Sequence, residues 1–568
     1  MKKLLIPIII IAAACASPKE KTQSISELAD AYLERMAARY PEERYYFDVP
    51  FDDHNRFSDN GLEALAAWQA FEDSLYTELQ GFDASGFAQA DQITYWLLKE
   101  ELERSQALRA CKRELWDVDH KWNFYNNWLS VVDFQPVGSD SLRKQALERW
   151  NIFPGYVDVE IDKLEHGLAE GYSMPKEIVR LVIDQVDVLS GYRIEESPFM
   201  GPAERDSSAA FKTAWQELVL ERIHPALAKY GDYLKNDYLP QARDEASVLA
   251  LPTGEACYRA YIRSNTTTNR TGKDIFEQGL QIVQANSATV QDLGQRLYGT
   301  SDFTEIIAGI KSDSTLYFKT ADEVLAHANA MVDSARLKCA DWFDLFPSSD
   351  MTVKPYLPHE SGIGSYEMAT DKNPAYFRIS LRNPERQTYH NNEKLAFHEG
   401  FPGHHLQLGI EGDIEGLHPI REIMGFTSYA EGWARYAEQL SEEMGLYQHQ
   451  ASLIHRRSWP ARGMVIDPAL HLNLWPRDSI IDFMMASGMS HGSATRLYQR
   501  SIVSPAQLTS YDVGGEEFKS LRKQAETELQ DDFDIKEFHK VVLENGSIPL
   551  SALRFQVEQW IARKQSGN

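Results

Sequence analysis

The sequence predicts a large, mainly helical protein with one small β-sheet, and three observations lead to this fold class. Most segments place apolar residues three or four positions apart, which is the spacing of one helix face. Strand-like alternation is sparse in the sequence, and no alternating βα pattern is evident. The composition, with 43% hydrophobic and 25% charged residues in a chain of 568, is typical of a folded globular protein.

Helical periodicity continues along most of the chain. Ile178, Leu181, Val182 and Val186 fall on one helix face, for example. The same period marks the ranges 62–80, 92–112, 140–170, 208–238, 272–298 and 320–342, and Pro or Gly residues interrupt the chain between them.

One segment is a good strand candidate, and it precedes the most informative motif. Residues 375–380 partly alternate polar and apolar side chains. We therefore expect a small sheet beside the helix that carries this motif. We also expect a single large helical unit at 27–568, with an N-terminal half at 27–265 and a second half at 266–568 that carries this motif.

The charge balance is acidic. The chain carries 58 Lys and Arg residues against 84 Asp and Glu residues, a formal net charge of -26 at pH 7. Binding to the phosphates of nucleic acid needs a basic surface. We therefore exclude nucleic acid as the main partner.

The first residues have the features of a bacterial export signal. A basic start precedes an apolar run that is too short to span a bilayer, and small residues then precede Cys15, as in the lipobox of bacterial lipoproteins. We expect a lipoprotein signal peptide at 1–15, a polar tether at 16–26 and a lipid anchor in the membrane at Cys15. The residue after Cys15 is Ala16 and not Asp, which is linked to retention in the inner membrane of enteric bacteria. We therefore expect the anchor to lie in the outer membrane, with the protein facing the periplasm. The alternative is an ordinary secretory signal cleaved near Ala14.

Three cysteines remain after Cys15, namely Cys111, Cys257 and Cys339. An odd number leaves at least one unpaired, and no CxxC pair indicates a cysteine metal site. A disulfide between two of them is compatible with an oxidising periplasm, and the sequence does not choose the pair.

The run 395–407 has the composition of a zinc-hydrolase site. It places His398 and Glu399 on an apolar helix, with His404 and His405 just beyond. In the usual HExxH helix, two histidines four residues apart share one face and bind the metal. The glutamate between them then acts as a base toward the metal-activated water.

The strict HExxH pattern fails because Pro402 stands where the second histidine would be. Regular helical geometry would not bring either His404 or His405 to a metal bound by His398. A helix break at Pro402 and Gly403 could restore one of them to the site.

A third ligand is available in the helical stretch 427–438. Glu431 follows His404 at about the distance at which zinc peptidases with a glutamate ligand supply it from a second helix. Two histidines and one glutamate leave the open coordination position of a catalytic zinc site. The competing interpretation is a pair of helix-capping histidines with surface carboxylates and no metal.

These motifs resemble those of family 885 of the bacterial domains of unknown function, a family considered metallopeptidase-like. The resemblance rests mainly on His398-Glu399-x-x-Pro402-Gly403-His404-x-x-Gln407 and Tyr429-x-Glu431-Gly432-Trp433-x-x-Tyr436. It implies a zincin-like, gluzincin-type fold with one zinc ion. It also favours His404 over His405 as the ligand, because the family varies at the following position.

Several residues of the second half are candidates for contacts with the substrate. Tyr511 and His471 could donate hydrogen bonds to the anionic intermediate of amide hydrolysis, and we class both as candidate catalytic residues. Arg462, Arg522 and Tyr376 are candidates for substrate binding. The alternative for each is a buried side chain with hydrogen bonds inside the protein.

Two further residues could orient the metal ligands through hydrogen bonds. These are His405, if it is not a ligand itself, and Glu438, which lies two helical turns after Glu431.

A different chemistry is suggested by the sequence around Ser490. Residues 488–492 match the GxSxG pattern of serine hydrolases. That pattern needs a strand of a parallel sheet before the serine, and residues 482–485 look helical instead. A catalytically inactive peptide-binding lipoprotein is a third interpretation.

Taken together, the residues favour a zinc-dependent hydrolase of the bacterial cell envelope. We expect it to cleave peptide bonds or small amides, with Glu399 as the general base.

Overall fold

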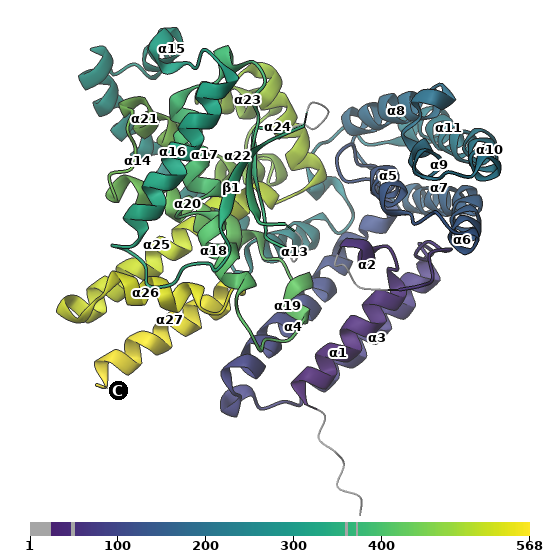
Figure 1. The fold of residues 1–568 in the computed structure, drawn as a ribbon, viewed down its shortest axis with the longest axis horizontal. Coiled ribbons are helices and arrows are strands. Elements are labelled where there is room, and N and C mark those ends of the chain that lie inside the picture. Colours follow the sequence, from purple (N-terminus) through teal and green to yellow (C-terminus); the bar gives the residue numbers. More distant parts are fainter. Residues whose placement is uncertain (1–23, 47–50, 358–361, 371–372, 568) are drawn as a thin grey trace, which may run out of the picture.

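The computed structural model describes residues 24–46, 51–357, 362–370 and 373–567. Within these ranges it confirms a mainly helical protein with one small sheet (Figure 1). The predicted signal peptide and Cys15 lie outside the described residues. The first helix begins at Ile25 and is capped by the Ser24 side chain, so the end of the predicted tether belongs to the folded unit. None of the described helices is long and apolar enough to cross a membrane.

The helices before the sheet fall into three consecutive groups. The first comprises α1 (Ile25–Arg39), α2 (Glu43–Tyr46), α3 (Leu62–Leu79) and α4 (Gln89–Leu108). The second comprises α5 (Phe124–Phe134), α6 (Asp140–Asn151), α7 (Phe153–Ala169), α8 (Lys176–Ser190), α9 (Gly201–Arg205), α10 (Ala209–Leu218), α11 (His224–Tyr233), α12 (Leu239–Gln241) and α13 (Gly254–Thr266). The third comprises α14 (Gly272–Tyr298), α15 (Phe303–Ser312) and α16 (Ala321–Cys339).

The sheet has three strands in the order β1-β3-β2. β1 (Met351–Pro355) pairs parallel with the central β3 (Ala375–Ile379), and β2 (Gly364–Glu367) pairs antiparallel with its other side. The predicted strand at 375–380 therefore corresponds to β3. Phe377 of β3 is fully buried, so one face of the sheet packs into the core.

The helices after the sheet carry the residues of the metal motif. They are α17 (Tyr389–Glu399), α18 (His404–Gly412), α19 (Ile420–Ile423), α20 (Thr427–Glu443), α21 (Gln450–Ser458), α22 (Arg462–His471), α23 (Arg477–Met485), α24 (His491–Val503), α25 (Ser510–Leu529), α26 (Ile535–Leu543) and α27 (Leu550–Gln565).

Each of the two large hydrophobic cores combines helices from both halves of the chain. Apolar side chains of α1, α3 and α4 pack with the sheet region and with α17, α18, α20 and α25–α27. Most of the chain from α5 to α13 instead packs with α22–α24. The chain thus crosses between the cores several times, because amphipathic helices distant in sequence complete each other's apolar faces.

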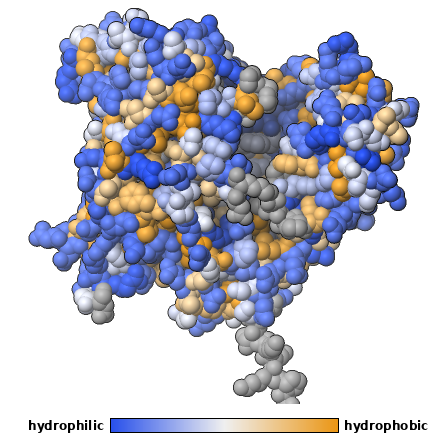
Figure 2. All heavy atoms as spheres, viewed as in Figure 1, coloured by the Kyte–Doolittle hydropathy of each residue, from blue (hydrophilic) through white to orange (hydrophobic). Residues whose placement is uncertain are grey.

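The helices α5–α11 form a lobe on the right of Figure 1, apart from the sheet and the C-terminal helices. Figure 2 shows that the surface is hollowed between this lobe and the rest of the molecule. A disulfide joins Cys111, just after α4, to Cys257 of α13. This settles the cysteine pairing, and Cys339 is a buried free thiol.

Candidate metal centre

The helix that carries His398 ends before His404. α17 ends at Glu399 and α18 begins at His404, so residues 400–403 form a turn between two helices. A Cβ on Gly403 would lie 2.0 Å from the carbonyl oxygen of His398, so the close approach of the turn to α17 requires glycine. The Trp433 indole donates a hydrogen bond of 2.9 Å to the Pro402 carbonyl and ties the turn to α20.

The turn brings His398 and His404 together with Glu431 of α20. His398 Nε2 lies 3.3 Å and His404 Nε2 lies 3.7 Å from the same atom, Glu431 Oε2. All three ligand atoms lie within 4.8 Å of one another. A tetrahedral zinc ion with bonds of about 2.0–2.2 Å holds its ligand atoms roughly 3.3–3.6 Å apart. The spacing of these side chains therefore fits a single ion.

The electrostatics of the cluster favour a cation. Glu431 Oε2 is buried and has no hydrogen-bond partner among the described residues. Burial lowers the pKa of His398, but the nearby carboxylates of Glu431 and Glu438 outweigh burial and raise that pKa to about 10. A positive charge, carried by a proton or by a metal ion, is thus stabilised between the two carboxylates.

Glu438 supports His398 from the side away from Glu431. Its Oε1 lies 2.8 Å from His398 Nδ1, so the other ring nitrogen faces the cluster. Burial raises the pKa of Glu438, but the charges of Lys394 and Arg435 outweigh burial and hold the pKa of that carboxyl well below its usual range. Arg435 donates hydrogen bonds to both oxygens of Glu438.

Close helix packing sets the position of Glu431. At Gly432, a Cβ would lie 2.6 Å from the backbone of Gly514 on α25, so the two helices touch at their glycines. α20 is therefore fixed against α25 at the residue that follows the third ligand.

The cluster opens into a cavity of about 840 Å³. His398, Glu399, His404 and Glu431 line it together with β2 residues 364–366. Glu399 thus shares the cavity with the three ligands without being one of them, which is the position a general base toward water requires.

His405 lies on the other side of α18. Its Nδ1 is 3.1 Å from the Tyr366 hydroxyl, and its ring contacts Phe401 edge-on. Burial lowers the pKa of His405 to about 4, so the side chain is neutral. The structure thus directs His404 into the cluster and His405 into the packing against the sheet.

His471 and Tyr511 do not line this cavity. His471 is fully buried, and its two nitrogens are bonded to the Val248 amide and the Ser501 carbonyl, so the ring has no free group for a substrate. Tyr511 lies beneath the Arg435 guanidinium, and its hydroxyl is 3.4 Å from Arg500. We therefore withdraw the catalytic role for His471, while Tyr511 is linked to the cluster only through Arg435.

The candidate substrate-binding residues are also engaged elsewhere. Arg462 donates to the carbonyls of Ser458 and Phe483 in the core. Arg522 forms ion pairs of 2.8 Å with Glu443 and Glu526, and the Tyr376 ring is covered by the Lys354 ammonium. None of the three lines the cavity, and the polar contacts of Arg462 and Arg522 stabilise the fold instead.

Ser490 is a helix cap and not a nucleophile. Its side chain accepts a hydrogen bond from the Ser493 amide at the start of α24, and α23 precedes it in place of a strand. The strand, turn and helix of a nucleophile elbow are therefore missing at this position.

Two residues that contact the predicted orienting side chains, Glu438 and His405, were not predicted from the sequence. Arg435 precedes Glu438 by three residues and forms an ion pair with it. This spacing places two side chains on the same helix face, so the ion pair was predictable from the sequence. Tyr366 reaches His405 from β2, and only the tertiary fold brings these two residues together.

Comparison with known proteins identifies the family. No curated protein matches the chain. Two solved structures share its fold, and each is described as a candidate lipoprotein. The protein from Colwellia psychrerythraea is 21% identical with a TM-score of 0.85, over 95% of this chain and 99% of that one. The protein from Shewanella oneidensis, further described as of unknown function, is 18% identical with a TM-score of 0.79, over 94% of this chain and 99% of that one. Residues 41–557 match the model of the bacterial proteins of unknown function DUF885, and the chain belongs to this family.

Proposed function

We propose that the protein is a metal-dependent hydrolase that cleaves peptide bonds or small amides, with zinc as its metal. The observation that carries this proposal is the convergence of His398, His404 and Glu431 from three helices, with Glu399 in the same cavity. Two histidines and one glutamate are a donor set of catalytic zinc sites, and a buried oxygen without a hydrogen-bond partner fits a bound cation.

The chain's own residues account for the proton transfers. A divalent ion held by the three ligands would act as a Lewis acid toward water and toward the substrate carbonyl. Glu399 takes a proton from the attacking water and returns it to the leaving nitrogen. Glu438 keeps His398 oriented during this reaction, because its carboxylate is itself fixed by Arg435.

The sheet supports a peptide as the substrate. β2 is an edge strand of the sheet, and its residues 364–366 line the cavity beside the candidate ligands. An extended peptide could pair with the backbone of such an edge and place a peptide bond over the cluster. This arrangement fits a linear chain better than a bulky folded protein.

We place the hydrolase in the bacterial cell envelope, anchored through Cys15 to the outer membrane and facing the periplasm. The lipobox-like sequence before Cys15 supports this location. The description of both similar structures as candidate lipoproteins supports it as well.

A peptide library tests the function. Purified protein loaded with zinc is incubated with a mixture of short peptides, and the cleavage products are identified by mass spectrometry. We expect hydrolysis that a chelator abolishes and that added zinc restores. Cleavage that continues unchanged in the chelator, or no cleavage of any peptide by the zinc-loaded protein, would overturn the proposal.

A further inference from the structure

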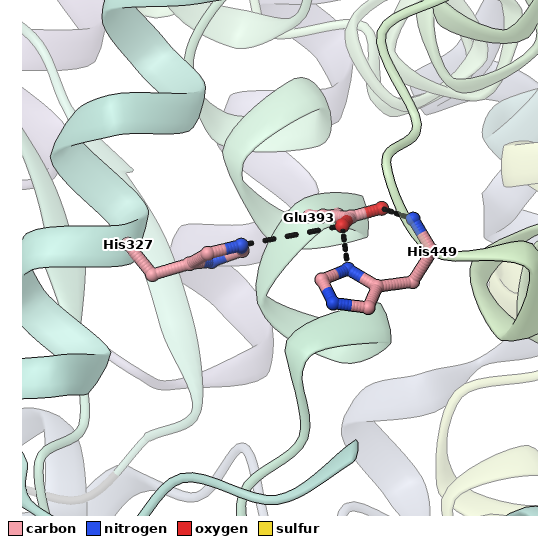
Figure 3. Close-up of side chains that lie close together, drawn as sticks. All are labelled: His327, Glu393 and His449. Atoms are coloured by element: carbon pink, nitrogen blue, oxygen red, sulfur yellow. Dashed lines mark hydrogen bonds and ion pairs between the residues drawn. The ribbon is translucent and has the colours of Figure 1, made fainter. Parts of the chain in front are cut away.

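A second cluster of metal-ligating side chains lies on the same helix as His398. Glu393 of α17 meets His327 of α16 and His449, the residue just before α21 (Figure 3). One ligand atom from each of the three lies within 4.8 Å of the others. We propose that His327, Glu393 and His449 form a second divalent metal site, distinct from the candidate centre and independent of the proposed hydrolase function.

The tautomer of His327 suits a metal ligand. The Asn392 amide nitrogen donates to the Val324 carbonyl at 3.4 Å, which leaves its oxygen directed at His327 Nδ1, 2.8 Å away. Nδ1 therefore carries the hydrogen, and Nε2 presents a lone pair. Nε2 is buried and has no hydrogen-bond partner among the described residues.

Glu393 is held so that one oxygen faces the two histidines. The side chain is fully buried. Its Oε2 accepts hydrogen bonds from the Ser452 hydroxyl at 2.7 Å and from the backbone amides of Gln448 and His449. Its Oε1 is left for the imidazoles, bonded to His449 Nδ1 and 4.0 Å from His327 Nε2. The carboxylate is thus oriented in advance for a ligand role.

A hydrogen bond from His449 Nδ1 satisfies Glu393 Oε1 without a metal, but it leaves His327 Nε2 without a partner beside the same oxygen. His327 Nε2 and Glu393 Oε1 both present lone pairs to each other across 4.0 Å, and the hydrogen of His327 is engaged with Asn392. Two buried acceptors that face each other are unfavourable unless a cation lies between them. A zinc-like ion with bonds of about 2.0–2.2 Å needs roughly 3.3–3.6 Å between its ligand atoms, which a small side-chain shift would provide.

The chemistry of the cluster indicates which ion it would take and what the ion would do. Two imidazoles and one carboxylate suit zinc and related divalent transition metals better than calcium or magnesium. The bound ion would join α16, α17 and the segment before α21. Because Glu393 lies five residues before His398 on α17, such a clamp would also steady the helix that carries the candidate centre.

Metal counting on the full chain tests this second site. Protein stripped with a chelator is reloaded with zinc, desalted and analysed for zinc per chain. We expect two equivalents for the wild type and one for a variant with Glu431→Gln and His404→Ala. A variant with His327→Ala and His449→Ala should also hold one equivalent, and combining all four substitutions should leave none. His166→Ala, which removes an exposed histidine paired with Glu170, should keep two.

Thermal unfolding gives a second readout that does not depend on activity. In the background with Glu431→Gln and His404→Ala, zinc should raise the Tm, and this shift should disappear when His327→Gln is added. The milder His327→Gln also serves if the alanine variants fail to fold. If the protein without the first site holds no zinc after desalting and shows no zinc-dependent Tm shift, the second site does not exist, and the hydrolase proposal is unaffected.

Discussion

Glu399 and Glu431 line one cavity at positions that suit different roles in the proposed reaction. Glu431 is held between two imidazoles, each within 3.7 Å of its Oε2, and so is placed to bind a metal. Glu399 follows a ligand directly in sequence, lines the same cavity and lies outside the ligand set. Both residues are glutamates, so their proposed roles differ only because they occupy different positions on two helices, α17 and α20.

Replacing Glu399 separates catalysis from metal binding. We expect Glu399→Gln to lower the turnover number at least about 100-fold, because the amide cannot accept a proton from water. The zinc content should stay unchanged because no ligand is lost. The measurement is hydrolysis of a cleaved library peptide beside metal analysis of the same sample.

Glu422→Gln is the matched control, since Glu422 lines the same cavity and is not one of the three candidate ligands. It should keep most of the activity. Near wild-type turnover in Glu399→Gln would show that another group is the base.

A buried aspartate away from the cavity makes the stability of the protein depend on pH. Asp467 accepts hydrogen bonds from the Tyr258 hydroxyl and the Ala506 amide, and burial raises the pKa of Asp467 to about 7. Between the unfolded value of 3.8 and about 7, the folded protein therefore binds more protons than the unfolded chain. The free energy of unfolding should fall as the pH rises through this window, by up to about 1 kcal/mol per pH unit, and level off above it.

Asp467→Asn should remove this part of the pH dependence, because the amide keeps the acceptor and cannot ionise. Urea unfolding at several pH values between 4 and 8 measures the difference between the two proteins. Asp232→Asn, at an exposed position of α11, should follow the wild type. Parallel profiles for the wild type and Asp467→Asn would contradict a raised pKa at this site.

At the scale of elements, the turn between α17 and α18 decides which histidine meets His398. Regular helix geometry would bring neither His404 nor His405 to it. The turn at residues 400–403 changes the direction of the chain between the two helices. The hydrogen bond from the Trp433 indole to the Pro402 carbonyl stabilises this turn. The interruption of the motif is therefore what makes the cluster possible.

Gly403→Ala tests the turn. The new Cβ would lie 2.0 Å from the His398 carbonyl oxygen and 2.4 Å from that of Phe397, so the backbone must shift. We expect a loss of about 2 kcal/mol or more in stability and weaker zinc binding, since His404 directly follows the substitution. Chemical denaturation and zinc titration measure the two effects.

Gly155→Ala provides the comparison, because a Cβ at this helical position meets nothing within 4 Å. It should leave stability unchanged or raise it slightly. Equal behaviour of the two variants would mean that the turn tolerates a side chain.

The sequence allowed the helical class, the strand at 375–380 and the residues of the first cluster to be proposed, because each depends on local periodicity or a short motif. His471, Arg462 and Arg522 were predicted to contact the substrate. The local sequence does not distinguish a buried structural histidine or arginine from a functional one. His327, Glu393 and His449 belong to no shared motif, and only the packing of α16 against α17 brings them together. The sequence did not show which helices share a core, because α1, α3 and α4 pack against helices that lie hundreds of residues away.

At the scale of the whole molecule, the proposed catalytic residues and the proposed membrane anchor lie far apart in the sequence. The first described helix begins at Ile25, ten residues after Cys15, so a substitution at Cys15 changes none of the described helices. Cys15→Ser should block lipid attachment and move the protein from the membrane fraction to the soluble fraction of the envelope. Cell fractionation with immunodetection measures this.

Ser17→Ala, two residues away, should leave the protein in the membrane fraction. Unchanged membrane association of Cys15→Ser would count against the lipobox and favour the alternative of an ordinary secretory signal.

Anomalous diffraction from crystals grown with zinc tests the central claim most directly. The account predicts an anomalous peak about 2.0–2.2 Å from His398 Nε2, His404 Nε2 and the Glu431 carboxylate. The peak should disappear from crystals of Glu431→Gln grown at the same zinc concentration. A zinc-loaded crystal with no peak between these three side chains, or with the ion bound by His405 in place of His404, would contradict it.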